Sequence, residues 1–344
     1  MPMNKPSVLV IYTGGTIGMK AHPVTGELIP FRFEHVLEEV PELRKFGFLI
    51  DTFSFDPVID SSNIVPDFWV KLALLIEEKY DLYDGFVILH GTDTMSYTAS
   101  ALSFMLENLQ KPVILTGSQL PIGMPRTDGK ENFISAVEIA AEKTPDGHAM
   151  VPEVCIFFQD RLFRGNRAFK YNAEEFRAFR SPNYPFLAEA GIQIKYNSNA
   201  IRYPHTWGEK LKVHTRLGTD VAILKIFPGI EKQVVSALLH IPGLRAVVLE
   251  TYGQGNAPSL EWLLTMLSKA VAEDTIILNI TQCPAGRVSM DSYACGARLK
   301  EAGVISGYDM TTEAALTKIM LLTGLYPDNE SVRSFLSIPL SGEF

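Results

Sequence analysis

The chain has 344 residues, more than a single hydrophobic core usually supports, so we expect two domains. Its composition, 47% hydrophobic and 20% charged, is that of an ordinary folded protein. The formal net charge of −8 disfavours a general affinity for nucleic acid phosphates or for anionic membrane surfaces. We therefore expect a small-molecule partner, no nucleic acid and no membrane.

The first residues and the apolar segments bear on location. Residues 1–6 lead straight into the first predicted strand and lack the charged region, apolar region and cleavage site of a secretion signal. The longest apolar runs have the length of strands, well short of the roughly 20 residues that cross a bilayer. The sequence predicts a cytoplasmic protein.

Strand and helix patterns alternate along nearly the whole chain, which is typical of a parallel sheet with helices on both faces. Runs of apolar residues suited to burial on both faces predict strands at 7–12, 85–89, 112–116, 154–158, 221–227, 246–250 and 275–280. Apolar residues at helical spacing predict helices at 66–76, 95–109, 129–142, 260–272 and 294–302.

The alternation breaks down between about 181 and 219, where Pro182, Pro185 and Pro204 punctuate a polar stretch. We interpret this stretch as the junction of two domains. The predicted organisation is an N-terminal domain at 1–190, a linker at 191–219 and a C-terminal domain at 220–344. The predicted fold is α/β, with a larger N-terminal parallel-sheet domain and a smaller, flavodoxin-like C-terminal domain.

Cys155, Cys283 and Cys295 form no Cys-x-x-Cys pair and have no histidine at ligand spacing, so the sequence predicts neither a disulfide framework nor a metal site. Cys283 stands in a strand-end loop and is a possible nucleophile, but no histidine lies near it in sequence to activate it. We favour a reduced structural thiol. Since neither Gly-x-Gly-x-x-Gly nor a Walker pattern is present, a bound nucleotide is disfavoured as well.

Several predicted strands end in loops that combine glycine with a hydroxyl side chain. They include 13–16 (Thr-Gly-Gly-Thr), 90–93 (His-Gly-Thr-Asp) and 116–119 (Thr-Gly-Ser-Gln). Because parallel strands point their carboxyl ends the same way, we expect these loops to converge on one pocket. Hydroxyls and carboxylates would come from Thr16, Asp60, Ser61, Ser62, Thr92 and Asp93. This set predicts nucleophilic chemistry.

A hydroxyl nucleophile needs a neighbouring base. His90 directly precedes the second loop, but adjacent residues at a strand end point apart, so a direct role is the less favoured interpretation. Lys170 is the other candidate, because a partly desolvated amine can accept a proton. A solvated surface lysine would give the same sequence, so the residues alone leave the choice open.

The hydroxyl-bearing loops belong to a longer series of motifs. In chain order these are 12–19 (YTGGTIGM), 60–62 (DSS), 84–95 (DGFVILHGTDTM), 116–119 (TGSQ), 161–167 (RLFRGNR), 252–258 (YGQGNAP) and 309–313 (DMTTE). With these motifs over nearly its whole length, the chain resembles the bacterial-type L-asparaginases, and specifically the cytoplasmic type I enzymes.

The resemblance implies hydrolysis of L-asparagine to L-aspartate and ammonia, without a metal or an organic cofactor. It implies that Thr16 attacks the side-chain carboxamide and forms an acyl-enzyme that water then releases. Thr92, Asp93 and Lys170 are similar to the family's second triad, in which the lysine amine takes a proton through the threonine hydroxyl. Which triad acts in which half-reaction is left open.

The resemblance also implies how the substrate is recognised. Asp60 and Asp93 would face the ammonium, Ser61 the carboxylate and the Ser118 backbone the carboxamide, with Ser62 as a further binding residue. Glutamine is one methylene longer, and a pocket discriminates one methylene by only about 1–3 kcal/mol, so weak glutaminase activity is expected.

The family assembles as dimers and as dimers of dimers, so the resemblance implies a homodimer or homotetramer. Its active site would lie at the subunit contact, to which another subunit contributes Asn256.

The chain departs from the family's pattern near Thr16. Many relatives have a tyrosine near it in the mobile loop, whereas the equivalent stretch here, 26–30 (GELIP), has none.

Two other functions compete with this one. An ammonia-generating subunit of a tRNA-dependent amidotransferase resembles asparaginases, but such subunits carry an added N-terminal domain and bind RNA, which the acidic charge disfavours. A non-catalytic amino acid sensor would keep the pocket without turnover, and the missing loop tyrosine is compatible with it.

Overall fold

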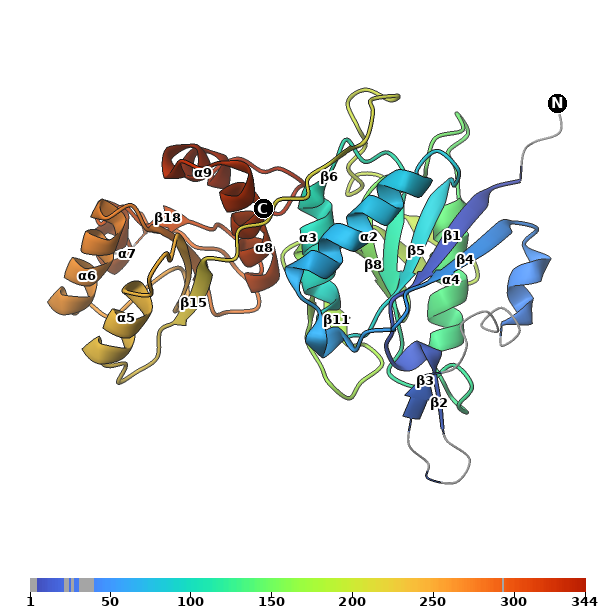
Figure 1. Cartoon of the computed structure of the whole chain (residues 1–344), viewed down its shortest axis with the longest axis horizontal. Helices are drawn as coiled ribbons and strands as arrows, with labels where there is room; N and C mark the ends of the chain where they lie inside the picture. The colour runs from blue at the N-terminus through green and yellow to red at the C-terminus, as the bar shows by residue number, and fades with distance from the viewer. Residues whose placement is uncertain (1–4, 22–24, 26–27, 31–39, 293) are drawn as a thin grey trace. The chain divides into compact units, whose positions relative to one another are not determined.

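The computed structural model describes residues 5–21, 25, 28–30, 40–292 and 294–344. The chain forms two compact units, Met1–Thr215 and Arg216–Phe344. In Figure 1 the colour runs from blue to yellow-green through the first unit and from yellow to red through the second. Both units are α/β, which confirms the predicted fold class.

In the part of the chain that the structure describes, a large mixed sheet of eight strands forms the centre of the first unit, and six further strands pair in three short two-stranded sheets. The described strands of this unit are β1 (Ser7–Tyr12), β2 (Met19–Ala21), β3 (Leu28–Pro30), β4 (Leu49–Ser54), β5 (Gly85–Leu89), β6 (Leu106–Glu107), β7 (Val113–Thr116), β8 (Val154–Phe158), β9 (Arg161–Arg164), β10 (Phe169–Lys170), β11 (Phe179–Arg180), β12 (Ala188–Ala190), β13 (Ile194–Tyr196) and β14 (Lys212–Val213). The order across the large sheet is β13-β12-β9-β8-β7-β5-β1-β4. The strands from β8 to β4 are parallel, and β9, β12 and β13 extend them by antiparallel pairing.

The strands predicted at 7–12, 85–89 and 154–158 are confirmed as β1, β5 and β8. Strand β4 was not predicted, because only Ile50 and Phe53 in it are even partly buried, as befits the edge of a sheet. The position of β4 beside β1 determines the strand order of the parallel part of the sheet. Numbered along the chain, the parallel strands lie in the order 2-1-3-4-5, which is the flavodoxin-like order.

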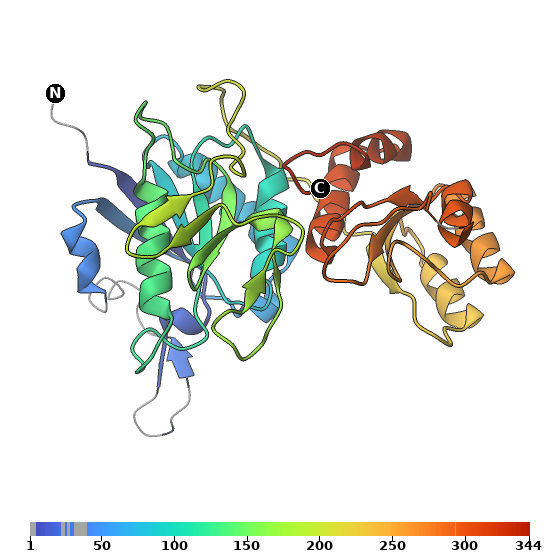
Figure 2. The same cartoon turned by 180° about the vertical axis from the view of Figure 1, so that it is seen from behind.

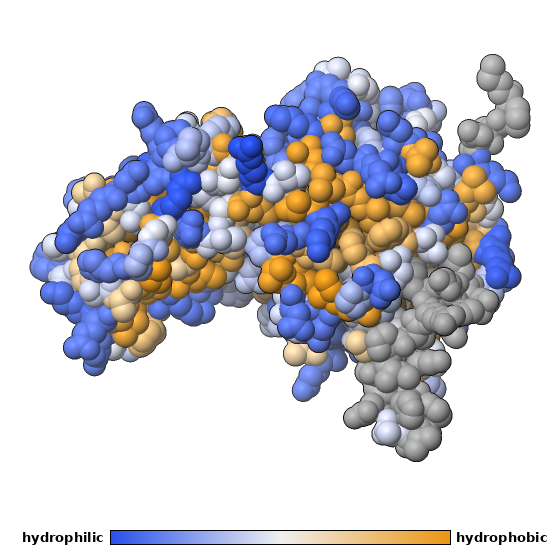
Figure 3. Space-filling model, viewed as in Figure 1, coloured by the Kyte–Doolittle hydropathy of each residue, from blue (hydrophilic) through white to orange (hydrophobic). Residues whose placement is uncertain are grey.

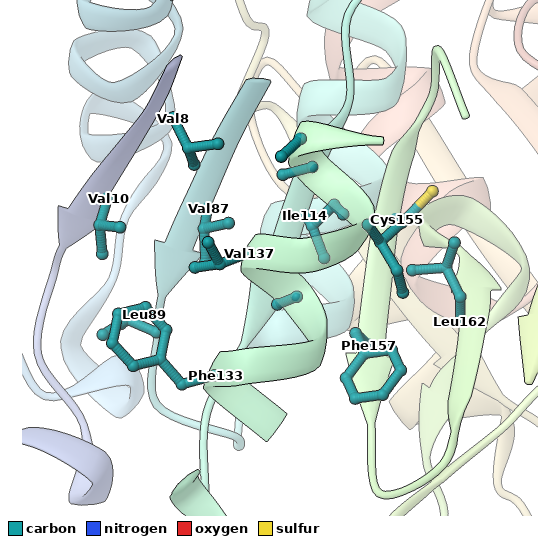
Figure 4. Close-up of a cluster of buried hydrophobic side chains, with 14 of the residues drawn as sticks. Val8, Val10, Val87, Leu89, Ile114, Phe133, Val137, Cys155, Phe157 and Leu162 are labelled. Carbon is teal, nitrogen blue, oxygen red and sulfur yellow. The ribbon is translucent and has the colours of Figure 1, made fainter. Parts of the chain in front are cut away.

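Helices cover both faces of this sheet. The α-helices described in the first unit are α2 (Pro66–Lys79), α3 (Met95–Met105) and α4 (Gly129–Ala141). Helices α2 and α3 lie on the face toward the viewer in Figure 1, and α4 lies on the opposite face, which Figure 2 shows. Figure 4 shows Phe133 and Val137 of α4 packed over Val87 and Leu89 of β5, and all four are fully buried. Burial of both faces explains why β5 reads as an unbroken apolar run.

The division between the units falls inside the segment 191–219 that the sequence predicts as a linker. Most of that segment is bound to the first unit, since β13 extends the large sheet and β14 pairs with β6. A buried ion pair adds to this. The guanidinium of Arg164 lies 2.6 Å from a Glu153 carboxylate oxygen and donates to the Ala200 carbonyl, while the Arg202 N–H donates to Glu153. Long-range polar contacts therefore carry the first unit to Thr215.

The second unit has a smaller sheet of β15 (Val221–Lys225), β16 (Ala246–Thr251), β17 (Ile276–Thr281) and β18 (Ile305–Ser306), all parallel. Its described helices are α5 (Lys232–Leu239), α6 (Glu261–Ala272), α7 (Ala294–Glu301), α8 (Thr312–Leu325) and α9 (Asn329–Leu336). The parallel α/β arrangement agrees with the prediction. The strands lie in chain order, however, so the flavodoxin-like order belongs to the first unit and not to the second. Successive right-handed crossovers that all advance in one direction produce chain order.

Apolar side chains also gather on part of the surface. In Figure 3 they lie on the face of the first unit that carries α2. Val65, which caps α2, Leu74 within α2 and Leu82 just after it are 56%, 44% and 65% exposed. Among the described residues, no helix combines the length and the apolar character that crossing a membrane requires.

Candidate active site

Strands β1 and β5 are neighbours at the point where the topology of the first unit reverses. From β1 the chain continues to β4 on one side, and from β5 it continues to β7 on the other. Open α/β sheets bind ligands in the crevice beyond the carboxyl ends of two such strands. The loops that leave these ends are 13–18 and 90–94, which carry Thr16, Thr92 and Asp93.

Three glycines let the backbones of the strand-end loops touch. A Cβ added to Gly14 would lie 2.1 Å from the Ile59 carbonyl oxygen, and one added to Gly15 would lie 2.6 Å from the Gly91 Cα. A Cβ added to Gly91 would in turn meet the Ser61 hydroxyl at 2.5 Å. Gly15 has a φ of +91°, in the region that favours glycine. These contacts bring the loops that begin at residues 13, 59 and 90 to one place. The first and third of these loops belong to the set for which the sequence predicts convergence.

Lys170 reaches this place from another part of the chain. It lies on β10, which pairs with β11 in a short hairpin. Its Nζ donates to the Thr92 Oγ1 at 2.8 Å and to an Asp93 carboxylate oxygen at 2.7 Å. The lysine side chain is 19% exposed and that of Asp93 is 63% exposed. The amine is therefore withdrawn from solvent beside a hydroxyl, where a proton can pass between them.

The remaining hydroxyls and carboxylate of the predicted set are placed by their own loops. Thr16 begins a 3-10 helix, Thr16–Gly18, directly after Gly15, and is half-buried. Asp60 is exposed and caps a second one, Ser61–Asn63, by accepting the Ser62 N–H at 3.0 Å. The Ser61 carbonyl accepts the Thr94 hydroxyl at 2.7 Å, which ties the loop after Asp60 to the loop after β5.

The loop after β7 carries Ser118 and a residue that the sequence analysis left without a role, Gln119. Ser118 is 2% exposed and donates its hydroxyl to the Leu120 carbonyl. The Asp128 carboxylate accepts the backbone N–H groups of Gln119 and Leu120 at 3.0 to 3.1 Å. The Gln119 side chain faces Thr92, with 3.5 Å between the Thr92 Oγ1 and the Gln119 Oε1. Its place in the TGSQ motif was the signal available in the sequence.

His90 does not contact the Lys170 and Thr92 pair and is fully buried. Its Nδ1 lies 2.6 Å from the Gly91 carbonyl, so that nitrogen carries the hydrogen and donates. Its Nε2 therefore accepts the Thr98 hydroxyl at 2.9 Å, and the Thr98 oxygen accepts the Trp69 indole N–H at 3.0 Å. Burial lowers the pKa of His90 to about 4, which keeps the ring neutral. Of the two candidate bases, Lys170 contacts the Thr92 hydroxyl, whereas His90 bonds to Thr98 and the Gly91 backbone and has a structural role.

Other predicted residues belong to other parts of the chain. Asn256 belongs to the second unit, where its Oδ1 accepts the Cys295 thiol at 2.9 Å. All three cysteines are free thiols, and Cys283 is exposed. Gly26 and Glu27, in the stretch that lacks the loop tyrosine, lie outside the described residues. Within the described ranges, no group of three or more histidine, cysteine, aspartate or glutamate residues could hold a metal ion.

Comparison with known proteins covers both units. The model of the asparaginase N-terminal family matches residues 7–202, and that of the glutaminase/asparaginase C-terminal domain matches residues 220–336. L-asparaginase 1 of Escherichia coli K12 is 45% identical over 99% of this chain and 98% of that protein. A mouse 60 kDa lysophospholipase is 41% identical over 92% of this chain but only 58% of its own length.

A solved structure agrees with both family models. The crystal structure of L-asparaginase I from Vibrio cholerae is 42% identical, covers 99% of both chains and superposes with a TM-score of 0.90. The motifs that carried the resemblance thus lie in a chain that matches this structure in fold over nearly the whole length of both chains. The protein belongs to the asparaginase family.

Proposed function

We propose that this protein hydrolyses the side-chain carboxamide of L-asparagine, giving L-aspartate and ammonia through a threonine nucleophile and an acyl-enzyme. The asparagine amidohydrolase activity rests on the full-length relatives that bear the name L-asparaginase. The observation that carries the chemistry is the Lys170 Nζ, 2.8 Å from the Thr92 Oγ1 and largely withdrawn from solvent. An uncharged amine in that place can accept the proton of a hydroxyl.

In this proposal the Thr16 oxygen attacks the carboxamide carbon and its proton leaves for a base. Collapse of the tetrahedral intermediate breaks the carbon–nitrogen bond, and ammonia departs with the transferred proton. Water then adds to the ester and releases aspartate. Support for two cooperating hydroxyls comes from the contact between Gly15 and Gly91, because each of these glycines immediately precedes a threonine of the set. Thr92, Asp93 and Lys170 form the proton-handling triad.

The substrate's amino acid end carries both charges, and the site offers a partner for each. Asp60 and Asp93 are exposed carboxylates, and we assign both to the ammonium. Ser61 and Ser62 are assigned to the carboxylate side, and the Ser118 backbone to the carboxamide. A pocket built this way discriminates glutamine by one methylene, so weak glutaminase activity belongs to the proposal.

We further propose a homodimer or homotetramer whose active site lies at the subunit contact and includes Asn256. The exposed apolar residues on the α2 face of the first unit support association, since contiguous apolar surface marks interaction sites. Light scattering after gel filtration tests the assembly, and a monomer with full activity would contradict it. A cytoplasmic location remains part of this proposal.

Steady-state ammonia release from asparagine and from glutamine, with the purified protein alone, is the experiment that decides the function. An amidotransferase subunit should need its partner, so turnover without one argues against that alternative. Calorimetry separates the enzyme from a sensor. Continuing heat of hydrolysis is expected here, whereas heat of binding without turnover would favour the sensor and overturn the proposal.

A further inference from the structure

The side-chain amide of Gln119 has a fixed orientation. Its Nε2 donates to two backbone carbonyls, those of Ala173 at 3.2 Å and Glu175 at 3.1 Å. An amide nitrogen has two hydrogens, and these carbonyls can accept both. The Oε1 must then face the other way, and it does so toward the Thr92 hydroxyl, 3.5 Å from the Thr92 Oγ1.

This orientation gives Thr92 two different neighbours. The Lys170 Nζ donates to the Thr92 oxygen at 2.8 Å, and the Gln119 Oε1 accepts from the Thr92 hydroxyl. The hydroxyl hydrogen thus points to Gln119 while the Lys170 amine donates to the hydroxyl oxygen. The distance of 3.5 Å is long, as catalytic hydrogen bonds often are in a structure without substrate.

Gln119 also contacts the hairpin that carries the lysine. The two carbonyls belong to residues 171–178, which connect β10 to β11, and Lys170 is the last residue of β10. This connection and the segment after β7 together line a cavity of about 440 Å³, whose walls are Gln119, Leu120, Pro125, Arg126, Ala173, Glu174 and Phe176. Because the cavity leaves the two segments incompletely packed against each other, directed hydrogen bonds hold the hairpin against the loop after β7.

We propose that Gln119 is a positioning residue that sets the Thr92 hydroxyl and the Lys170 hairpin relative to each other. The inference rests on the proposed function for its kinetic consequence, though not for its structural one. Gln119 acts through Thr92 and Lys170, so it should govern kcat more than KM. Loss of its hydrogen bonds should also loosen residues 171–178.

The test compares Gln119→Met with a control in the same hairpin, Asn172→Ala. Methionine keeps the shape of glutamine and removes both the donors and the acceptor. The Asn172 Oδ1 accepts the N–H groups of Glu174 and Glu175 at 2.7 and 3.0 Å, so its removal loosens the turn without touching Thr92. Asparagine turnover and hydrogen exchange of the amides of Tyr171 and Asn172, both of which donate to the Ala178 carbonyl, are measured for each protein.

We expect faster exchange in both variants. For Gln119→Met we expect kcat to fall about tenfold or more with KM within about threefold, and for Asn172→Ala a distinctly smaller loss of kcat. Equal losses in the two variants would reduce Gln119 to a support of the hairpin and overturn its role toward Thr92. Unchanged exchange in Gln119→Met would overturn the role toward the hairpin. Wild-type turnover in the same assay tests the proposed function separately, and the exchange result stands without any turnover.

Discussion

Both units end their parallel strands in threonine and glycine loops, yet the hydroxyls meet very different partners. In the first unit, Thr92 is half-buried and bonded to an amine. In the second unit, the Thr251 hydroxyl is fully buried at the end of β16 and donates to the Asn279 side chain at 2.7 Å. The Asn279 amide in turn donates to the Gly255 carbonyl at 3.2 Å. One hydroxyl is available for chemistry, and the other holds two strand ends together.

The difference does not come from the loops themselves, because the same residue types occur in both. It comes from β10 and β11, a hairpin of the first unit that brings Lys170 to Thr92. Nothing comparable is described near Thr251 in the second unit, where the hydroxyl has the side chain of Asn279 and the backbone of Ile280 as its partners. A threonine at a strand end can take part in proton transfer when a non-adjacent segment supplies an amine beside it.

Removal of the Thr92 hydroxyl should have the most severe effect on activity. Thr92→Val keeps the shape of the side chain, and we expect turnover to fall by about 10³-fold or more, because the lysine loses the group it acts on. The melting temperature should change little, since Thr92 is only half-buried. Steady-state kinetics with asparagine measure the loss.

Thr92→Ser is the matched control for that variant. It keeps the hydroxyl, so turnover should stay within about tenfold of the wild type. A Thr92→Val protein with full activity would remove Thr92 from the mechanism, whatever the serine variant did.

Acid should affect the first unit through His90, whose folded pKa is about 4 against 6.5 for an unperturbed histidine. The unfolded chain takes up this proton as the pH falls through 6.5, and the folded chain does not until about pH 4. The unfolded state therefore binds more protons in this window, and acidification favours it. The stabilisation is complete above pH 6.5, and about 3 kcal/mol is lost by pH 4.

His90→Asn isolates that contribution. Its amide can still donate to the Gly91 carbonyl, but it has no group that titrates. In urea denaturation at pH 7 and pH 5, the wild type should lose about 2 kcal/mol more than the variant. Parallel losses in the two proteins would mean that His90 does not titrate differently in the folded state.

Local apolar patterns were enough to predict β1, β5 and β8, since strands buried on both faces leave a clear run of apolar residues. They failed for β4, whose exposed edge position leaves only Ile50 and Phe53 partly buried. They also gave no strand order for either unit. Strand order depends on which strands pair across the sheet, and the missing β4 was the strand that sets it.

The candidate site could likewise be predicted in part. Residues in strand-end loops, such as Thr16, Thr92 and Asp93, could be grouped because parallel strands align their carboxyl ends. Lys170 could not be chosen over His90 from sequence, because its approach depends on a hairpin pairing between β10 and β11. Gln119 had no assigned role, since its amide is oriented by backbone carbonyls more than 50 residues away.

Removal of the Thr251 hydroxyl in the second unit should change stability and leave turnover nearly intact. Thr251→Val makes the same chemical change as Thr92→Val, but it leaves a buried Asn279 oxygen without its donor. That should lower the free energy of unfolding by about 1–3 kcal/mol, measured by urea denaturation, while the folded variant keeps its turnover within about threefold. The two valine variants would then show opposite phenotypes, one losing turnover and the other stability. If Thr251→Val lost turnover to the same degree as Thr92→Val, the division between a chemical and a structural hydroxyl would be wrong.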